Sequence, residues 1–169
     1  MATSHLRILD DRARDFKVSS DGLLNARKLA TGDEDLVVVL IEPTDKAEQV
    51  SYTEMLAASP TLLYVNETLQ LASGGQRDME NTIILNIRAF RSNSFRSSQS
   101  LDDRICDDEL AYNKFEQIMS ILRPRVAVVC QCATNKANNT FVRDICSSIE
   151  DAGDIYLQKL PNGHECLFV

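Results

Sequence analysis

The segment Thr-Ile-Ile-Leu-Asn-Ile-Arg-Ala-Phe-Arg at residues 82–91 joins an apolar run to an amide side chain and two arginines. Residues 82–87 predict a buried strand, because a continuous run of isoleucine and leucine is typical of a strand covered on both faces. In open α/β sheets the ligand crevice lies outside the carboxyl ends of the strands, so Asn86 is positioned to contact a bound group. The alternative is that Asn86 ends the strand and hydrogen-bonds its own turn.

Three further apolar runs extend this pattern into a sheet, and they cover residues 36–41, 126–130 and 155–159. Helical patterns separate the runs: a capping box at Ser51 and Glu54, an amphipathic stretch at 61–71, another at 107–122, and a helix that Asn138 or Asn139 can cap. Strands that alternate with helices at this spacing favour parallel βαβ units. We therefore predict an α/β fold, a three-layer α/β/α sandwich with a central, mainly parallel four-stranded sheet and helices on both faces.

The length of 169 residues suits one domain with one core. Within this single domain, residues 1–33 are polar and mixed in sign, and we expect them to form an N-terminal helical arm. No apolar run reaches the roughly 18 residues of a membrane span, and the N-terminus lacks the apolar region of a signal peptide. The sequence predicts no membrane partner and an intracellular protein, nuclear or cytoplasmic.

The five cysteines, an odd number, suggest reduced thiols. Their spacing lacks paired Cys-x-x-Cys motifs, so we expect no metal site, and Cys130 and Cys132 fit small buried hydrophobic positions. A nucleophilic pair of Cys166 and His164 has no sequence signature. The glycines build neither a phosphate-binding loop nor a dinucleotide motif, so no cofactor is predicted and a Rossmann-like small-molecule enzyme has no motif in its favour.

The net charge of −7 opposes non-specific binding to a polyanion. The charges are segregated, however, because residues 81–98 carry Arg88, Arg91 and Arg96 without any acid, whereas residues 102–109 carry five acids against one arginine. The arginine segment is suited to grip a polyanion locally, although a solvated surface loop would have the same composition.

Three polar positions are expected near the carboxyl ends of the predicted strands. They are Glu42 before a proline, Asn86, and His164 shortly after the last strand. An acid, an amide and an imidazole that meet in one crevice could orient water, hold a base edge and polarise a carbonyl. Taken singly, Glu42 also fits a solvated acid beside a turn, and His164 also fits a plain turn residue after Asn162 and Gly163.

The order of these parts resembles the uracil-DNA glycosylase superfamily. That family has an apolar strand ending in a short Gly/acid/Pro motif, a strand ending in Leu-Leu-Asn, a Lys/Arg-Pro-x-Val strand and a closing His-Pro-Ser motif. The counterparts here are residues 36–43, 84–86, 123–129 and 163–166, so the resemblance covers roughly residues 36 to 168 through order and spacing. The first motif lacks the preceding glycine, and Glu165 and Cys166 replace the family's Pro and Ser.

The resemblance implies a role for several residues of this chain. Asn86 would hydrogen-bond an extruded base, His164 would stabilise charge on its carbonyl, and Glu42 or Asp45 would orient water. Leu167 would be the apolar wedge. Further, Arg88, Arg91 and Arg96 would hold DNA phosphates.

Two functions follow from these observations. The altered motifs and the negative charge favour a divergent protein that is weak or inactive as a glycosylase and acts as a binding or scaffold module, with a protein partner. The alternative is an active DNA glycosylase, an N-glycosyl hydrolase that excises uracil or a damaged base from DNA by base flipping.

Overall fold

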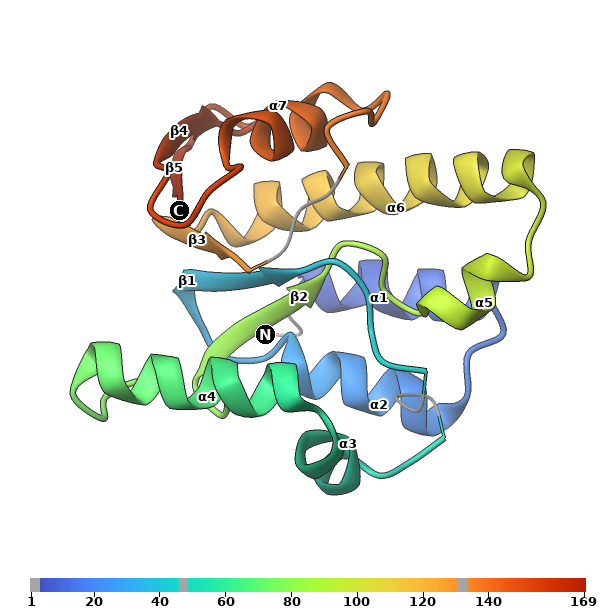
Figure 1. Ribbon diagram of the computed structural model, residues 1–169, viewed down its shortest axis with the longest axis horizontal. Coiled ribbons are helices and arrows are strands. Elements are labelled where there is room, and N and C mark those ends of the chain that lie inside the picture. The colour runs from blue at the N-terminus through green and yellow to red at the C-terminus, as the bar shows by residue number, and fades with distance from the viewer. Residues whose placement is uncertain (1–3, 46–48, 131–133) are drawn as a thin grey trace.

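The computed structural model describes residues 4–45, 49–130 and 134–169. Over these residues the chain forms seven helices and five strands (Figure 1). In chain order they are α1 (Ser4–Asp15), α2 (Ser20–Leu29), β1 (Asp33–Leu40), α3 (Tyr52–Ala58), α4 (Pro60–Ser73), β2 (Thr82–Asn86), α5 (Asn93–Ser97), α6 (Leu101–Leu122), β3 (Val126–Val129), α7 (Thr140–Ser148), β4 (Tyr156–Lys159) and β5 (Glu165–Phe168).

The strands form one mostly parallel sheet in the order β2-β1-β3-β5-β4. The pairs β1–β2, β1–β3 and β3–β5 are parallel, and only β4–β5 is antiparallel. The predicted α/β class is confirmed, but the prediction of four strands is wrong because Glu165–Phe168 adds a fifth between β3 and β4. A tight turn joins β4 to β5, with the Gly163 amide donating to the Leu160 carbonyl at 2.8 Å, and so short a connection permits only antiparallel pairing.

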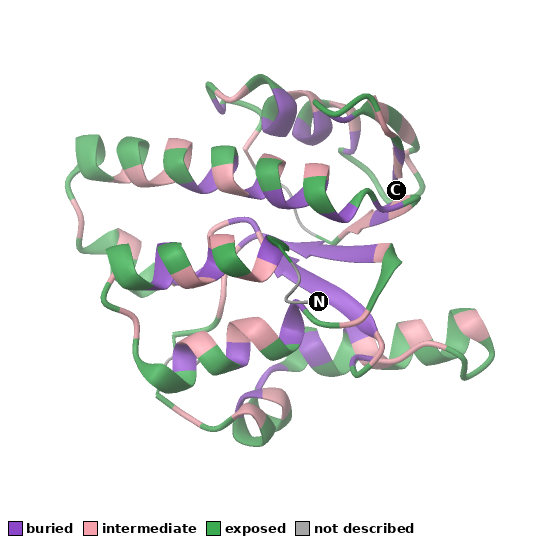
Figure 2. Ribbon diagram, turned by 180° about the vertical axis from the view of Figure 1, so that it is seen from behind, coloured by how far each residue is buried: buried purple, intermediate pink, exposed green. Residues whose placement is uncertain are grey.

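Helices cover both faces of the sheet, as predicted. Val37, Val39 and the side chains that share their face pack against α1, α6 and α7, whereas Val38 and Leu40 pack against α2, α3 and α4. Successive side chains of a strand point to opposite faces, so a continuous apolar run buries both. Figure 2 shows β1 and β2 largely in purple, between helices whose inner faces are also buried.

The predicted helix signals mostly lie where the structure uses them. Ser51 and Glu54 form the capping box of α3, and Asn139 caps α7 through the Val142 amide. The predicted helix at 107–122 instead begins at Leu101, because Ser100 caps it and accepts a hydrogen bond from the Asp103 amide at 3.2 Å. The exposed side chains of its first turns, Leu101 among them, disguised its amphipathic pattern.

The N-terminal residues are helical, as expected, but they belong to the core rather than to an arm. Leu9 and Ala13 of α1 are buried in the main hydrophobic cluster. The His5 ring lies 2.9 Å from the Ala30 carbonyl oxygen and ties α1 to the end of α2. Polar residues on the outer faces of both helices hid this packing in the sequence. In the described part of the chain, no helix is long and apolar enough to cross a membrane.

The cysteines differ from the expected set of reduced thiols. Cys106, Cys130 and Cys166 are free, but Cys146 is disulfide-bonded, so the prediction is wrong for that residue. Spacing alone does not reveal such pairing. Cys130 is exposed just after β3 rather than buried, and Cys132 lies outside the described residues. Burial raises the pKa of Cys166 to about 12, which keeps this thiol protonated.

Candidate functional site

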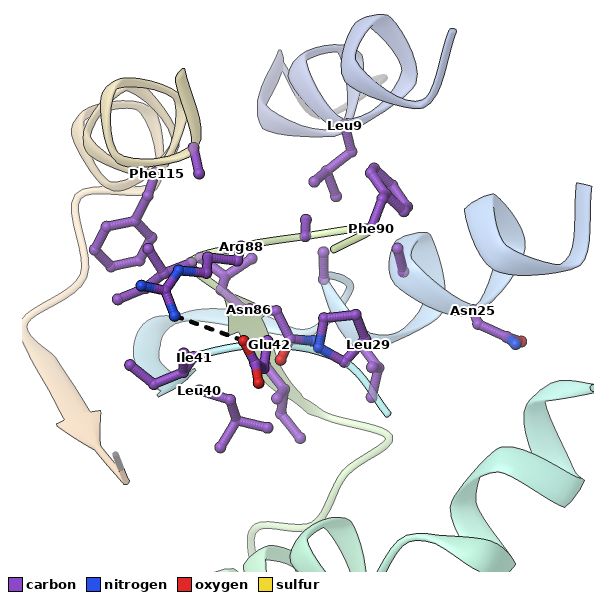
Figure 3. A pocket seen from close by; sticks show the side chains of 18 of the residues that line it. Leu9, Asn25, Leu29, Leu40, Ile41, Glu42, Asn86, Arg88, Phe90 and Phe115 are labelled. Atoms are coloured by element: carbon purple, nitrogen blue, oxygen red, sulfur yellow. Dashed lines mark ion pairs between the residues drawn. The ribbon is translucent and has the colours of Figure 1, made fainter. Parts of the chain in front are cut away.

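A cavity of about 340 Å³ lies at the carboxyl ends of β1 and β2 (Figure 3). Apolar side chains such as Leu9, Leu29 and Phe115 form much of its wall, and they come from α1, α2 and α6. Ligand pockets typically measure about 300–1,000 Å³ and are mostly apolar with a few polar groups. This cavity therefore has the size and lining of a site for a small organic molecule.

Two of the predicted site residues, Glu42 and Asn86, line this cavity together. Leu40 pairs with Asn86 in the parallel ladder, and the ladder continues beyond both strands. The Ile87 amide donates to the Leu40 carbonyl at 2.9 Å, and the Arg88 amide donates to the Ile41 carbonyl at 2.8 Å. These two bonds continue the pairing of the two segments into the cavity wall, so the acid and the amide lie at the same end of the two strands.

The side-chain amide of Asn86 makes no hydrogen bond within the described residues, and its buried Oδ1 is without a donor. The alternative that Asn86 hydrogen-bonds its own turn is therefore wrong. A buried carbonyl oxygen without a donor costs about 1–3 kcal/mol, so such groups are uncommon in proteins. The amide offers one acceptor and two donors to whatever occupies the cavity.

The arginine segment and the acidic segment that follows it fold onto each other. Asp108 accepts from Arg88 Nε at 2.9 Å and from Arg96 Nη2 at 2.7 Å, while Asp107 lies 3.1 Å from Arg91 Nε. The three arginine side chains are only 12–14% exposed. They are interior ion pairs, and the structure does not present them as free cations for DNA phosphates. The charge segregation in the sequence reflects pairing within the molecule.

Glu42 belongs to the same ion-pair network. Its Oε2 lies 3.5 Å from Arg88 Nη1, as the dashed line in Figure 3 marks, and 3.7 Å from Arg96 Nη1. Arg88 also donates to the Tyr112 hydroxyl at 3.0 Å. Although burial alone would lower it, the pKa of Arg88 is raised by Tyr112 and Asp108, so this guanidinium keeps its charge. The network fixes Glu42 beside the cavity as an engaged carboxylate.

Phe90 closes part of the cavity wall in a strained conformation. Its φ of 67° places a bulky residue in the left-handed region, and its side chain is 5% exposed beside Leu9 (Figure 3). Such a backbone costs of order 1–3 kcal/mol, and strain of this kind concentrates at functional sites.

Asp45, the other predicted acid, lies away from the cavity lining. It is exposed and binds α5, accepting from the Ser94 hydroxyl at 2.6 Å and from the Ser94 amide at 3.3 Å. Hydrogen bonds from the hydroxyls of Ser94 and Ser92 lower the pKa of Asp45. Its carboxylate anchors a short helix and is not directed at Asn86.

His164 lies at the opposite end of the strands from Glu42 and Asn86, so its predicted convergence with these two residues is wrong. It precedes β5, a strand parallel to β3, and therefore sits at the amino end of the strands. Its Nε2 lies 2.9 Å from the Pro124 carbonyl oxygen, just before β3. Leu167 pairs with Val126 and Leu157 in mid-sheet, a position that excludes a protruding wedge.

The sequence analysis missed Arg12, a charged residue that lines the cavity from α1 and is 2% exposed. Its neighbours Leu9 and Ala13 share its buried face, and this helical spacing was the only available signal.

No three or more His, Cys, Asp or Glu side chains gather into a metal site anywhere in the described ranges. Comparison of the chain with models of known protein families and with curated protein sequences finds no match.

Proposed function

We propose that this chain is a binding module of the uracil-DNA-glycosylase-like kind that holds a small planar nitrogen heterocycle in its cavity and is weak or inactive as a glycosylase. The ligand class is a ring with an adjacent N–H and C=O, as in uracil and other nucleobases. The observation that carries the proposal is the hydrogen-bond-free amide of Asn86 in a cavity of about 340 Å³.

The chemistry of the amide selects this ligand class. Asn86 offers an acceptor, Oδ1, beside a donor, Nδ2, and a lactam or imide edge offers the reverse pair. Two parallel hydrogen bonds would satisfy the carbonyl oxygen, which receives no hydrogen bond from the described residues. The apolar walls, including Leu29 and Phe115, suit the faces of a flat ring.

The charges favour a binding role over DNA repair. The three arginines proposed to hold phosphates are bound to Glu42, Asp107 and Asp108, and the chain carries a net charge of −7. A duplex would meet repulsion, and these three paired arginines are not free to compensate it. His164 lies at the amino ends of the strands, and the described residues that line the cavity include no histidine to stabilise charge on a departing base.

Active glycosylase chemistry remains the second candidate, because Glu42 and Asn86 line one cavity. Glu42 is engaged by two guanidiniums, which opposes its use as the group that orients water. We expect no robust formation of abasic sites when the protein is in excess over a uracil-containing oligonucleotide, single- or double-stranded. Efficient excision that is abolished by Asn86→Ala would show that the protein is an active glycosylase and would refute the binding role.

Calorimetric titration of the full chain with uracil tests the proposal. Saturable binding is expected, and Asn86→Ala should weaken it about tenfold or more, since two hydrogen bonds of ~0.5–1.5 kcal/mol each are lost. Asn86→Asp should weaken it further because both oxygens are then acceptors. The matched control is Asn135→Ala, at an exposed asparagine outside the cavity lining. Absence of binding to the wild type, or equal loss in the control, would refute the proposal.

A further inference from the structure

Arg12 is a buried cation without a polar partner. Its side chain makes no hydrogen bond or ion pair within the described residues, and both Nε and Nη2 are buried without an acceptor. Its guanidinium carbon lies 4.9 Å from the centroid of the Phe16 ring. A buried charge of this kind is costly unless something pairs with it.

Three carboxylates act on Arg12 from longer range without pairing with it: Asp107, Asp108 and Asp15. Asp107 and Asp108 are paired instead with Arg91, Arg88 and Arg96. With Glu42, three partly buried carboxylates face the three arginines of that network, whereas Arg12 forms no ion pair within the described residues. Burial, together with the positive charge of Arg91, lowers the pKa of Arg12 to about 10, so it remains charged at neutral pH.

More cations than acids line the cavity. Its charged residues are Arg12, Arg88 and Lys114 against the single acid Glu42, in a chain whose overall charge is strongly negative. Arg88 is occupied by Glu42, Asp108 and Tyr112, and Lys114 has only a 3.5 Å contact to the Gln117 side-chain oxygen. Among these cations, Arg12 has buried donors without an acceptor in the described part of the chain.

From these observations we infer that Arg12 is the anion-binding group of the cavity, and that the natural ligand is a planar heterocycle bearing a carboxylate or a phosphate. This inference rests on the proposed function, because Asn86 would bind the ring edge while Arg12 binds the charged substituent. A guanidinium presents parallel N–H donors that match the oxygens of either anion. Binding such a group would satisfy both uncommitted nitrogens at once.

The test compares three probes by calorimetry with the full chain: uracil, uracil-6-carboxylate and uridine 5′-monophosphate. We expect at least one anionic probe to bind about 10- to 100-fold more tightly than uracil, the effect of one charge-assisted hydrogen-bonded contact. Preference for the carboxylate indicates an anion attached to the ring, and preference for the monophosphate indicates a nucleotide. Each of these results supports the inference and identifies the source of the anion.

The variants separate this inference from the proposed function. Arg12→Met should bring the anionic probe down to the affinity that the same variant has for uracil, and Arg12→Lys should retain part of the preference. The control Arg14→Met alters an exposed arginine of the same helix that pairs with Asp11. Thermal unfolding checks each fold, and Arg12→Met should unfold at a higher temperature than wild type because a buried unpaired charge is gone.

The outcomes are distinguishable. If uracil binds but neither anion improves affinity, or if Arg12→Met keeps the preference, the role of Arg12 is refuted and the proposed function stands. If none of the three probes binds, both the proposed function and this inference are refuted.

Discussion

Polar residues lie at both ends of the parallel strands, but their hydrogen bonding differs between the two ends. At the carboxyl ends of β1 and β2, the side-chain oxygen of Asn86 is buried without a hydrogen bond, and the residue lines a cavity. At the amino edge of β3 and β5, the His164 ring meets the Pro124 carbonyl and its amide donates to Asn162 at 2.9 Å. Asn162 in turn donates to the Ser120 carbonyl.

This difference shows that the position of a polar residue at the end of a strand does not identify a site by itself. Whether the protein satisfies the hydrogen bonds of that residue is the better indicator. Asn86 ends β2 and His164 directly precedes β5, but of the two only Asn86 has a buried side-chain atom without a hydrogen bond. A polar group kept unsatisfied in the interior reduces stability, and proteins retain such groups where function requires them. We expect the two edges to respond in opposite ways to substitution.

The largest expected effect comes from the ion-pair network beside the cavity. Arg88→Met would leave Glu42 and Asp108 with Arg96 alone and would remove the donor to the Tyr112 hydroxyl, and we expect the free energy of unfolding to fall by ~1.5–3 kcal/mol. The control Arg27→Met removes a partly exposed pair with Asp10 and should cost at most ~1 kcal/mol. Denaturant unfolding followed by circular dichroism measures both, and equal losses would contradict the interior role of Arg88.

The next prediction sets one edge against the other. Asn86→Leu removes a buried carbonyl without a donor and should raise the free energy of unfolding by ~1–2 kcal/mol. His164→Ala removes the contact with the Pro124 carbonyl and should lower it by ~0.5–1.5 kcal/mol. The comparison fails if both variants lose stability in denaturant unfolding.

The smallest effect concerns Asp45, a residue near the carboxyl edge whose oxygens are satisfied. Hydrogen bonds from Ser94 and Ser92 lower its pKa in the folded protein, so Asp45 contributes stability above its unfolded value of about 3.9. That contribution is lost as the pH falls from this value through the lower folded pKa. Ser94→Ala should raise the midpoint of Asp45 in a carbon-13 NMR titration. An unchanged midpoint would show that the bond to α5 does not form in solution.

The fold was largely predictable because its strands are written as continuous apolar runs and its helices carry capping residues. The runs at 36–41 and 82–87 and the box at Ser51 and Glu54 each determine one element locally. The short strand β5 was missed because only four residues form it, after a turn. Without β5, the direction of β4 and the edge on which His164 lies were not deducible.

The site was predictable only in part, because hydrogen-bond satisfaction is a tertiary property. Glu42 and Asn86 were found from their place after strands, and parallel pairing brings such positions together. The pairing of Arg88 with Asp108 depends on how α6 packs after the loop that precedes it. Arg12 precedes Glu42, the nearer predicted site residue, by 30 positions in the sequence. No local pattern connects these residues.

The most direct test of the central claim, that the Asn86 amide contacts the ligand, is an NMR titration of the nitrogen-15-labelled chain with uracil. We expect saturable shifts in the side-chain amide signals of Asn86 and in the backbone amides of Ile87 and Arg88, whereas Gly163 and His164 should not shift. Shifts centred on Gly163 and His164, or no saturable shift at Asn86, would contradict the account.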